Sequence, residues 1–282
     1  MHLQEFLSLL LFVFLAIPHA IISKICSCFT SKIYRQRTIV ALPYSHFSEK
    51  VFWAHDRSKV AYEVRHVFQG FFPTTLLEFA APSVPIVVGD PPGRVIKDSK
   101  DALNALSAEG NAWLYPSAAV RKIESGFGDA FGKGVARILY HHLFTTNEGN
   151  VLLRRMWKVG VSPLERLLVD PLYPACRFAM MGGMGIPGDL AGSIAAVDEA
   201  FDCVTALLQD GRKYICGTPE MTAADVTFAA LAFPLVLPEE KADVLCSWND
   251  KLPEVLRAEV RRRRKSPAGQ FVLRLYTEER HL

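Results

Sequence analysis

The hydroxyl of Ser45 is the side chain of this sequence that is best placed to do chemistry. It follows an apolar run over 38–42, typical of a β-strand, and it opens a stretch over 45–57 whose apolar residues share one helical face. A serine where a strand ends and a helix begins lies beside unpaired backbone N–H groups and the positive end of the helix dipole. Such a position favours an anion, including a bound thiolate. The alternative is that Ser45 is only an N-cap, with Ser48 or Glu49 completing the first turn.

The elements predicted around Ser45 form a compact α/β unit. A second strand is predicted at 61–66, a short helix at 72–80, and two further strands at 85–88 and 94–97, joined by the turn signal Gly89-Asp-Pro-Pro-Gly93. Ser99 is then predicted to cap a helix that runs to Ala108. A unit of about 70 residues needs a partner domain to bury its other face.

The partner domain is predicted to be all-helical. Helical patterns broken by glycine and proline cover 118–145, 148–158, 163–180, 189–210, 222–237 and 240–264. Gly182-Gly-Met-Gly185 is predicted to be a loop. The glycine-rich run from Gly126 to Lys133 follows no strand and lacks Ser or Thr after the lysine, so we interpret it as a helix interruption and not as a phosphate-binding loop.

Composition argues against several classes of function. The 282 residues carry a net charge of only +3, which gives no reason to expect a nucleic-acid partner. The six cysteines include no Cys-x-x-Cys pair, and His141-His142 has no carboxylate at metal-ligand spacing, so we expect reduced thiols in a cytosol-facing domain and no metal. The basic run over 261–265 either touches anionic lipid or lies at a helix end, where cations are stabilised.

The N-terminus predicts a membrane anchor. Residues 6–22 are apolar except for Ser8, Pro18 and His19, and as a helix they would span roughly 25 Å. No Lys or Arg precedes them, which argues against a cleaved signal peptide, and the basic residues that follow place the folded body in the cytoplasm. Pro18 and His19 leave an in-plane placement open. Cys26 and Cys28 are either palmitoylated or unmodified linker thiols.

From residue 38 to about 280 the chain resembles the glutathione transferase superfamily at four places. The first is Ser45-His-Phe-Ser-Glu-Lys-Val-Phe-Trp-Ala, which is similar to the start of the first helix in serine-class members. The second and third are Ser83-Val84-Pro85-Ile86 and Lys97-Asp98-Ser99. The fourth is the stretch from Gly211 to Phe228, which contains a capping box, Thr222-x-x-Asp225, with a folding role.

The resemblance implies a role for each matching residue. Ser45 would hydrogen-bond the glutathione sulfur and hold it as thiolate. Val84 would pair through its backbone with the cysteinyl part of glutathione, before a cis Pro85. Asp98 and Ser99 would bind the γ-glutamyl end, with Asp one methylene shorter than the family's Glu; alternatively, both only cap the helix. Phe52 replaces a common arginine and is expected at a surface or interface.

The fold class that follows is a thioredoxin-like domain with a helical bundle behind a membrane helix. The expected division is 1–23 anchor helix, 24–37 basic linker, 38–110 thioredoxin-like domain, 111–118 linker and 119–282 helical domain. The expected function is that of a membrane-anchored glutathione transferase, with glutathione as co-substrate, a hydrophobic electrophile between the domains and a homodimer as the family's habit.

Two other functions remain open to different degrees. A non-catalytic scaffold or organelle-membrane interaction protein is the alternative, favoured by the anchor and by Asp98. A thiol-disulfide enzyme is disfavoured, because Ser45 and Ser48 occupy both positions where that chemistry needs cysteine.

Overall fold

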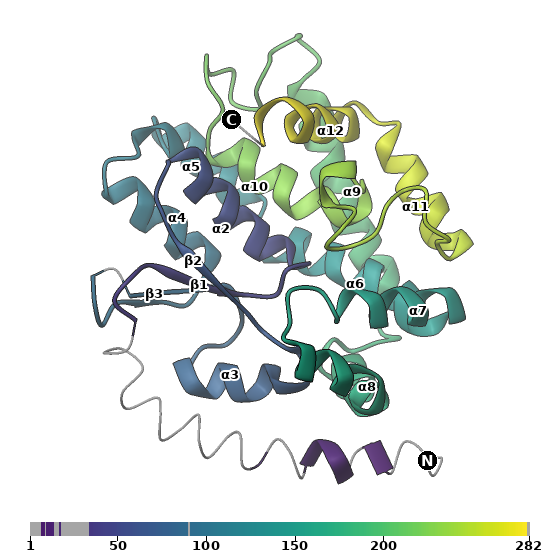
Figure 1. Ribbon diagram of the computed structural model, residues 1–282. Helices are drawn as coiled ribbons and strands as arrows, with labels where there is room; N and C mark the ends of the chain where they lie inside the picture. The colour runs from purple at the N-terminus through teal and green to yellow at the C-terminus, as the bar shows by residue number, and fades with distance from the viewer. Residues whose placement is uncertain (1–6, 9, 14–16, 18–33, 90, 281–282) are drawn as a thin grey trace.

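The computed structural model describes residues 7–8, 10–13, 17, 34–89 and 91–280. A mixed four-stranded sheet comes first and a helical region follows it (Figure 1), in agreement with the predicted thioredoxin-like and helical parts. The strand order is β2-β1-β3-β4, with β1 parallel to β2, β3 antiparallel to β1, and β4 antiparallel to β3. The strands are β1 (Thr38–Ala41), β2 (Glu63–His66), β3 (Ile86–Val88) and β4 (Val95–Ile96).

Helices cover both faces of the sheet. Figure 1 shows α2 (His46–Arg57) and α4 (Ser99–Ala108) on one face and α3 (Phe72–Phe79) on the other. Alternation along β1 explains this, because Ile39 packs in the cluster shared with α2 and α4, whereas the next residue, Val40, belongs to the cluster on the opposite face. Short 3₁₀ turns, η1 (Gln69–Phe71) and η2 (Ala112–Leu114), precede α3 and follow α4.

The second half of the chain is helical, as predicted. Its elements are α5 (Ala118–Gly126), α6 (Asp129–Thr145), α7 (Asn147–Met156), α8 (Pro163–Gly183), α9 (Leu190–Leu207), α10 (Ala223–Ala232), η3 (Phe233–Leu235), η4 (Glu239–Lys241), α11 (Glu254–Arg264) and α12 (Pro267–Glu279). The break between α5 and α6 confirms the helix interruption predicted from the glycines.

Three local predictions were wrong. The single helix expected over 240–264 is a 3₁₀ turn, η4, followed by α11, whose N-cap is Pro253. The loop expected at Gly182 is the last turn of α8, which continues to Gly183. Phe52 is not at a surface: it is buried and stacks on Tyr62 with ring centroids 5.9 Å apart.

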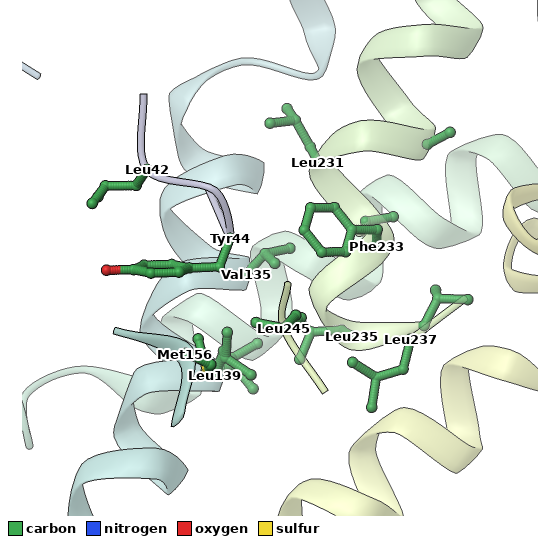
Figure 2. Packing of buried hydrophobic residues seen from close by; sticks show 14 of the residues in the cluster. Leu42, Tyr44, Val135, Leu139, Met156, Leu231, Phe233, Leu235, Leu237 and Leu245 are labelled. Atoms are coloured by element: carbon green, nitrogen blue, oxygen red, sulfur yellow. The ribbon is translucent and has the colours of Figure 1, made fainter. Parts of the chain in front are cut away.

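One continuous core joins the sheet to the helical region. Figure 2 shows Leu42 and Tyr44, which follow β1, beside Val135 and Leu139 of α6, with Phe233 and its neighbours beyond them. Every residue of α10 is buried, and α10 begins at the predicted capping box. There the Asp225 carboxylate accepts the backbone N–H groups of Thr222 (2.8 Å) and Ile215 (2.7 Å). The expected folding role of this motif follows from these contacts.

Buried ion pairs fix α2 to the helical region. Glu49 accepts hydrogen bonds from Lys241 (2.6 Å) and Arg280 (2.7 Å), and Lys50 donates to Glu124 of α5 (2.7 Å). Because these partners lie far apart in sequence, the orientation of α2 depends on the whole fold and not only on the sheet.

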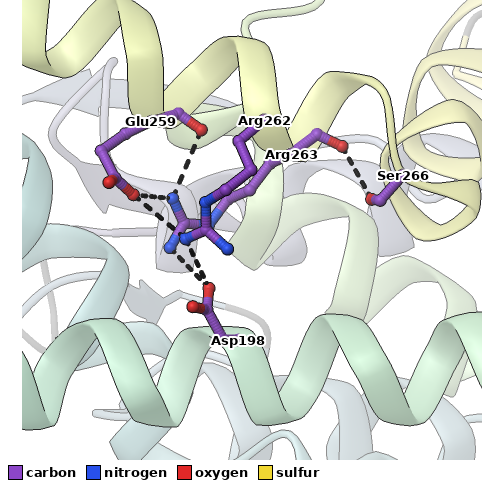
Figure 3. Close-up of polar contacts among 5 residues, drawn as sticks. All are labelled: Asp198, Glu259, Arg262, Arg263 and Ser266. Carbon is purple, nitrogen blue, oxygen red and sulfur yellow. Dashed lines mark hydrogen bonds and ion pairs between the residues drawn. The ribbon is translucent and has the colours of Figure 1, made fainter.

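The basic run at the end of α11 makes contacts within the protein. Figure 3 shows Arg262 and Arg263 both donating to Asp198 of α9 (2.8 and 2.9 Å) and contacting Glu259 one turn earlier. Arg264 donates to two backbone carbonyls, of Val236 and Leu237. These contacts favour the helix-end interpretation of the run over lipid binding.

The predicted anchor lies largely outside the described residues, as do Cys26, Cys28 and most of the linker over 24–37. Within the described part of the chain, we find no helix both long and apolar enough to cross a bilayer.

Candidate functional site

Ser45 lies where the sequence predicted, at the N-cap of α2. Its backbone is extended, and its Oγ accepts a hydrogen bond from the backbone N–H of Ser48 at 3.3 Å. Since a hydroxyl both accepts and donates, the Ser45 proton stays available for a second partner. The side chain is half-buried and borders a cavity, so that partner can be a ligand.

The cavity beside Ser45 has a volume of about 450 Å³ and lies between the sheet domain and the helices α6 and α8. Its walls are mostly apolar. The lining side chains include Phe12, Phe47, Phe72, Leu139, Met180 and Met184. A space of this size and character suits a small apolar molecule next to a few polar groups.

Val84 borders the same cavity. The peptide between Val84 and Pro85 is cis, as the resemblance implied. Ser45 and Val84 are therefore brought together around one space, although 38 positions of sequence separate the two residues. Pro85 itself is not among the lining residues.

Asp98 and Ser99 lie at the start of α4, and neither lines this cavity. The sequence predicted Ser99 as the cap, but the N-cap is Asp98, whose Oδ1 accepts the backbone N–H of Lys100 at 2.7 Å. An aspartate is as good an N-cap as a serine, so local preference did not decide between the two neighbours. Ser99 is buried and Asp98 is exposed.

His46 positions Ser45, and no pattern in the sequence indicated this role. Its Nε2 lies 2.9 Å from the carbonyl oxygen of Gly132 in α6. Burial lowers the pKa of His46 to about 4, so the ring is neutral near pH 7 and donates its Nε2–H to that carbonyl. His46 therefore joins the first turn of α2 to the helical region and does not serve as an acid or base.

Further polar groups in the cavity wall were also missed. Tyr44 donates its hydroxyl proton to Gln69 Oε1 at 2.9 Å, and Tyr140 and Cys176 face the cavity from α6 and α8. Burial raises the pKa of both tyrosines, and it raises that of the Cys176 thiol to about 12, so all three groups are neutral. Only the adjacency of Tyr44 to Ser45 was a signal available in the sequence.

No protein-family model and no curated protein sequence matches the chain. Solved structures do match its fold. A glutathione S-transferase of Ceriporiopsis subvermispora in complex with glutathione has a TM-score of 0.57 at 14% identity, over 87% of this chain and 97% of that one. Glutathione transferase GSTFuA3 of Phanerochaete chrysosporium has a TM-score of 0.55 at 14% identity, over 86% and 96% of the two chains.

A third similar structure is FzlA from C. crescentus, with a TM-score of 0.54 at 17% identity, over 87% of this chain and 89% of that one. At such identities the likeness concerns the fold alone. The chain has the glutathione S-transferase fold, as its four resembling stretches predicted.

Proposed function

We propose that this chain is a glutathione-dependent transferase. The observation that carries the proposal is the place of Ser45: its hydroxyl caps α2, keeps one proton free, and borders a cavity that Val84 also lines. Similar structures that hold glutathione add support for the ligand.

The chemistry follows from this geometry. The Ser45 hydroxyl donates its proton in a hydrogen bond to the glutathione sulfur, while the N-terminus of α2 adds its positive dipole end. Both interactions favour the thiolate, so the pKa of the bound thiol falls and its proton leaves to solvent. The thiolate then attacks an electrophilic carbon, a carbon–sulfur bond forms, and the displaced group departs with the electron pair.

The remaining roles are also part of the proposal. The Val84 backbone would bind the cysteinyl part of glutathione ahead of Pro85, and Asp98 and Ser99 its γ-glutamyl end at the N-terminus of α4. A hydrophobic electrophile would occupy the cavity against α6 and α8. Residues 6–22 would attach the protein to a membrane with its folded part facing the cytoplasm.

One observation favours a non-catalytic scaffold instead. The Asp98 carboxylate already accepts the Lys100 N–H, so a ligand ammonium would have to share it or displace this bond. Failure to bind glutathione would make that second function the better one.

The test is calorimetric glutathione binding and turnover by the full chain. We expect Ser45→Ala to lower turnover by about 10²-fold and to leave glutathione affinity nearly unchanged, because one hydrogen bond to the reacting anion is lost. The bound thiol should also titrate at higher pH, followed by thiolate ultraviolet absorbance. Ser99→Ala should instead weaken glutathione binding.

Ser48→Ala is the matched control. Ser48 lies one turn along the same helix, is fully buried, and its hydroxyl finds no partner among the described residues. The variant should bind and turn over like the native chain. Full activity in Ser45→Ala would show that Ser45 only caps α2.

A further inference from the structure

The described residues near the N-terminus, 7–8, 10–13 and 17, are called here the N-terminal segment, and Ser8 docks this segment on α8 through its buried hydroxyl. Ser8 Oγ donates to the carbonyl oxygen of Pro171 (2.8 Å) and accepts the backbone N–H of Ala175 (3.2 Å). An undistorted helix would pair those two groups with each other. Pro171 and Pro174 interrupt this part of α8, and a side chain that enters the hydrogen-bond ladder there has both groups within reach.

The face that carries Ser8 also forms part of the candidate site. Phe12 lies one helical turn beyond Ser8 and lines the cavity that Ser45 borders. Leu11 packs against the buried core of the protein. This side of the segment is therefore a wall of the cavity.

The opposite face of the segment is apolar and exposed, and so is the adjoining surface of α8. We call this surface the outer apolar face. Its residues have exposed fractions from 43% to 77%: Leu7, Leu10, Val13, Ile17, Leu164, Leu167 and Phe178. They are seven of the eleven large hydrophobic residues that are exposed in the described chain, which is too strong a concentration for scattered surface positions. Figure 1 shows the described N-terminal residues alongside α8 at one edge of the molecule.

A segment that is apolar all round needs an apolar partner on every side. The protein supplies one partner, at Ser8, Leu11 and Phe12. The second partner must be apolar, because no charged residue stands between positions 6 and 22. It must also be compatible with the basic residues that follow in the sequence. Lys24 and Lys32 stand next in the sequence, and Arg35 and Arg166 are exposed. Hydrocarbon beside anionic headgroups meets both conditions.

We propose that the N-terminal segment lies in the plane of a bilayer, held between α8 and the lipid, and does not cross the membrane. The outer apolar face is the lipid-binding surface, and α8 contributes Leu164, Leu167 and Phe178 to it. This inference rests on the membrane attachment proposed above and specifies its geometry. Phe12 then separates the cavity from the bilayer by one layer of helix, so an apolar electrophile dissolved in lipid has a short path to Ser45.

The experiment uses the full chain with vesicles of phosphatidylcholine and phosphatidylserine, combined by detergent removal and separated by flotation. The α8 variant Leu164→Ser/Leu167→Ser/Phe178→Ser should bind vesicles at least about tenfold more weakly, because three side chains lose their burial in hydrocarbon. The native chain should be released from the vesicles by alkaline carbonate, which leaves spanning helices in place.

The control variant is Val151→Ser/Val255→Ser. It removes exposed apolar residues of α7 and α11, away from this face, and it should bind vesicles like the native chain. Circular dichroism and thermal unfolding should be alike in all three proteins, since every changed residue is exposed.

Three results would overturn the inference. Vesicle binding by the α8 variant at native strength, together with resistance to alkaline carbonate, would show a spanning helix. Loss of a dimer in the α8 variant by light scattering, with vesicle binding unchanged, would assign the face to a second copy of the chain. Absence of any vesicle binding by the native chain would refute membrane attachment itself, while glutathione binding would still decide the transferase proposal independently.

Discussion

His46 donates a hydrogen bond from Nε2 to the carbonyl oxygen of Gly132, across 2.9 Å. This bond joins the residue directly after Ser45 to α6, which forms part of the apolar wall of the cavity. The distance between the candidate sulfur ligand and the apolar wall is thus set by a contact between the two domains. Burial keeps the imidazole neutral, although the hydrogen bond to Gly132 acts on the pKa in the opposite direction.

The stability of the protein should fall as the pH drops below about 6.5. Burial lowers the pKa of both His46 and His55 to about 4, whereas in the unfolded chain both titrate near the ordinary 6.5. At pH values between about 4 and 6.5, the two histidines bind protons in the unfolded state but not in the native state, so protonation favours unfolding. At about pH 5 each histidine should cost about 2 kcal/mol of unfolding free energy, measured by urea denaturation against about pH 7.5. The drop should shrink in His46→Gln and persist in His141→Gln, a half-exposed position of α6. A urea midpoint constant across this range would contradict the prediction.

Removal of the Glu49 carboxylate should destabilise the whole protein. Burial alone would raise the pKa of this carboxyl, but Lys241 and Arg280 beside it hold the pKa below its usual range. Glu49→Ala leaves Lys241 without its carboxylate and leaves Arg280 only the exposed Asp56, so it should cost about 3–5 kcal/mol of unfolding free energy. The control is Asp129→Ala, which breaks an exposed pair with Lys133 and should cost under about 0.5 kcal/mol. An equal loss of unfolding free energy in Glu49→Ala and Asp129→Ala, measured by chemical denaturation, would show that the buried Glu49 pairs stabilise the protein no more than an exposed pair does.

The buried capping box of α10 should contribute more to the free energy of unfolding than an exposed capping box does. Asp225→Ala leaves the buried N–H groups of Ile215 and Thr222 without an acceptor. Each lost hydrogen bond should cost about 1–3 kcal/mol of unfolding free energy. Ser162→Ala removes the capping serine of α8, where the box is exposed, and should cost about 1 kcal/mol. Thermal unfolding of the two variants tests the order. A smaller loss of stability in Asp225→Ala than in Ser162→Ala would mean that α10 is held in place by its apolar contacts alone.

A larger side chain at Ala136 should close the apolar cavity without touching the glutathione contacts. Ala136 lines the cavity from α6, and a leucine at this position adds three carbon atoms that would fill part of the cavity. We expect the affinity for an apolar fluorescent dye, anilinonaphthalene sulfonate, to fall by about tenfold, with glutathione affinity unchanged. Ala130→Leu, at an exposed position of the same helix, should have no effect on either. A dye affinity equal to that of the native chain would place apolar binding elsewhere.

Local patterns in the sequence predicted those parts of the fold that depend on local structure. The strand-to-helix junction at Ser45 and the capping box at Asp225 were found because caps and periodicity involve neighbouring residues. The choice of Asp98 over Ser99 as a cap was missed, since both are good caps. The break before α11 was missed because the helical period was continued across Pro253.

Contacts between distant segments were beyond what the sequence allows. The bond from His46 to Gly132, the burial of Phe52 against Tyr62 and the insertion of Ser8 into α8 all join residues whose pairing depends on the completed fold. The membership of Phe12 and Tyr140 in the cavity wall has the same origin. The position of Ser45 at the start of α2 was therefore predictable from the sequence, whereas the shape of the cavity that it borders was not.

The contacts of α2 also decide how ligands can come and go. His46, Glu49 and Lys50 each bind a partner in the helical region, so hinge opening of the two domains along α2 would break several buried bonds at once. Exchange of an apolar ligand should instead use the opposite wall, where Phe12 and α8 close the cavity with apolar contacts and the Ser8 hydroxyl. The part of the chain that we place against lipid would then also line the route by which substrate enters and product leaves.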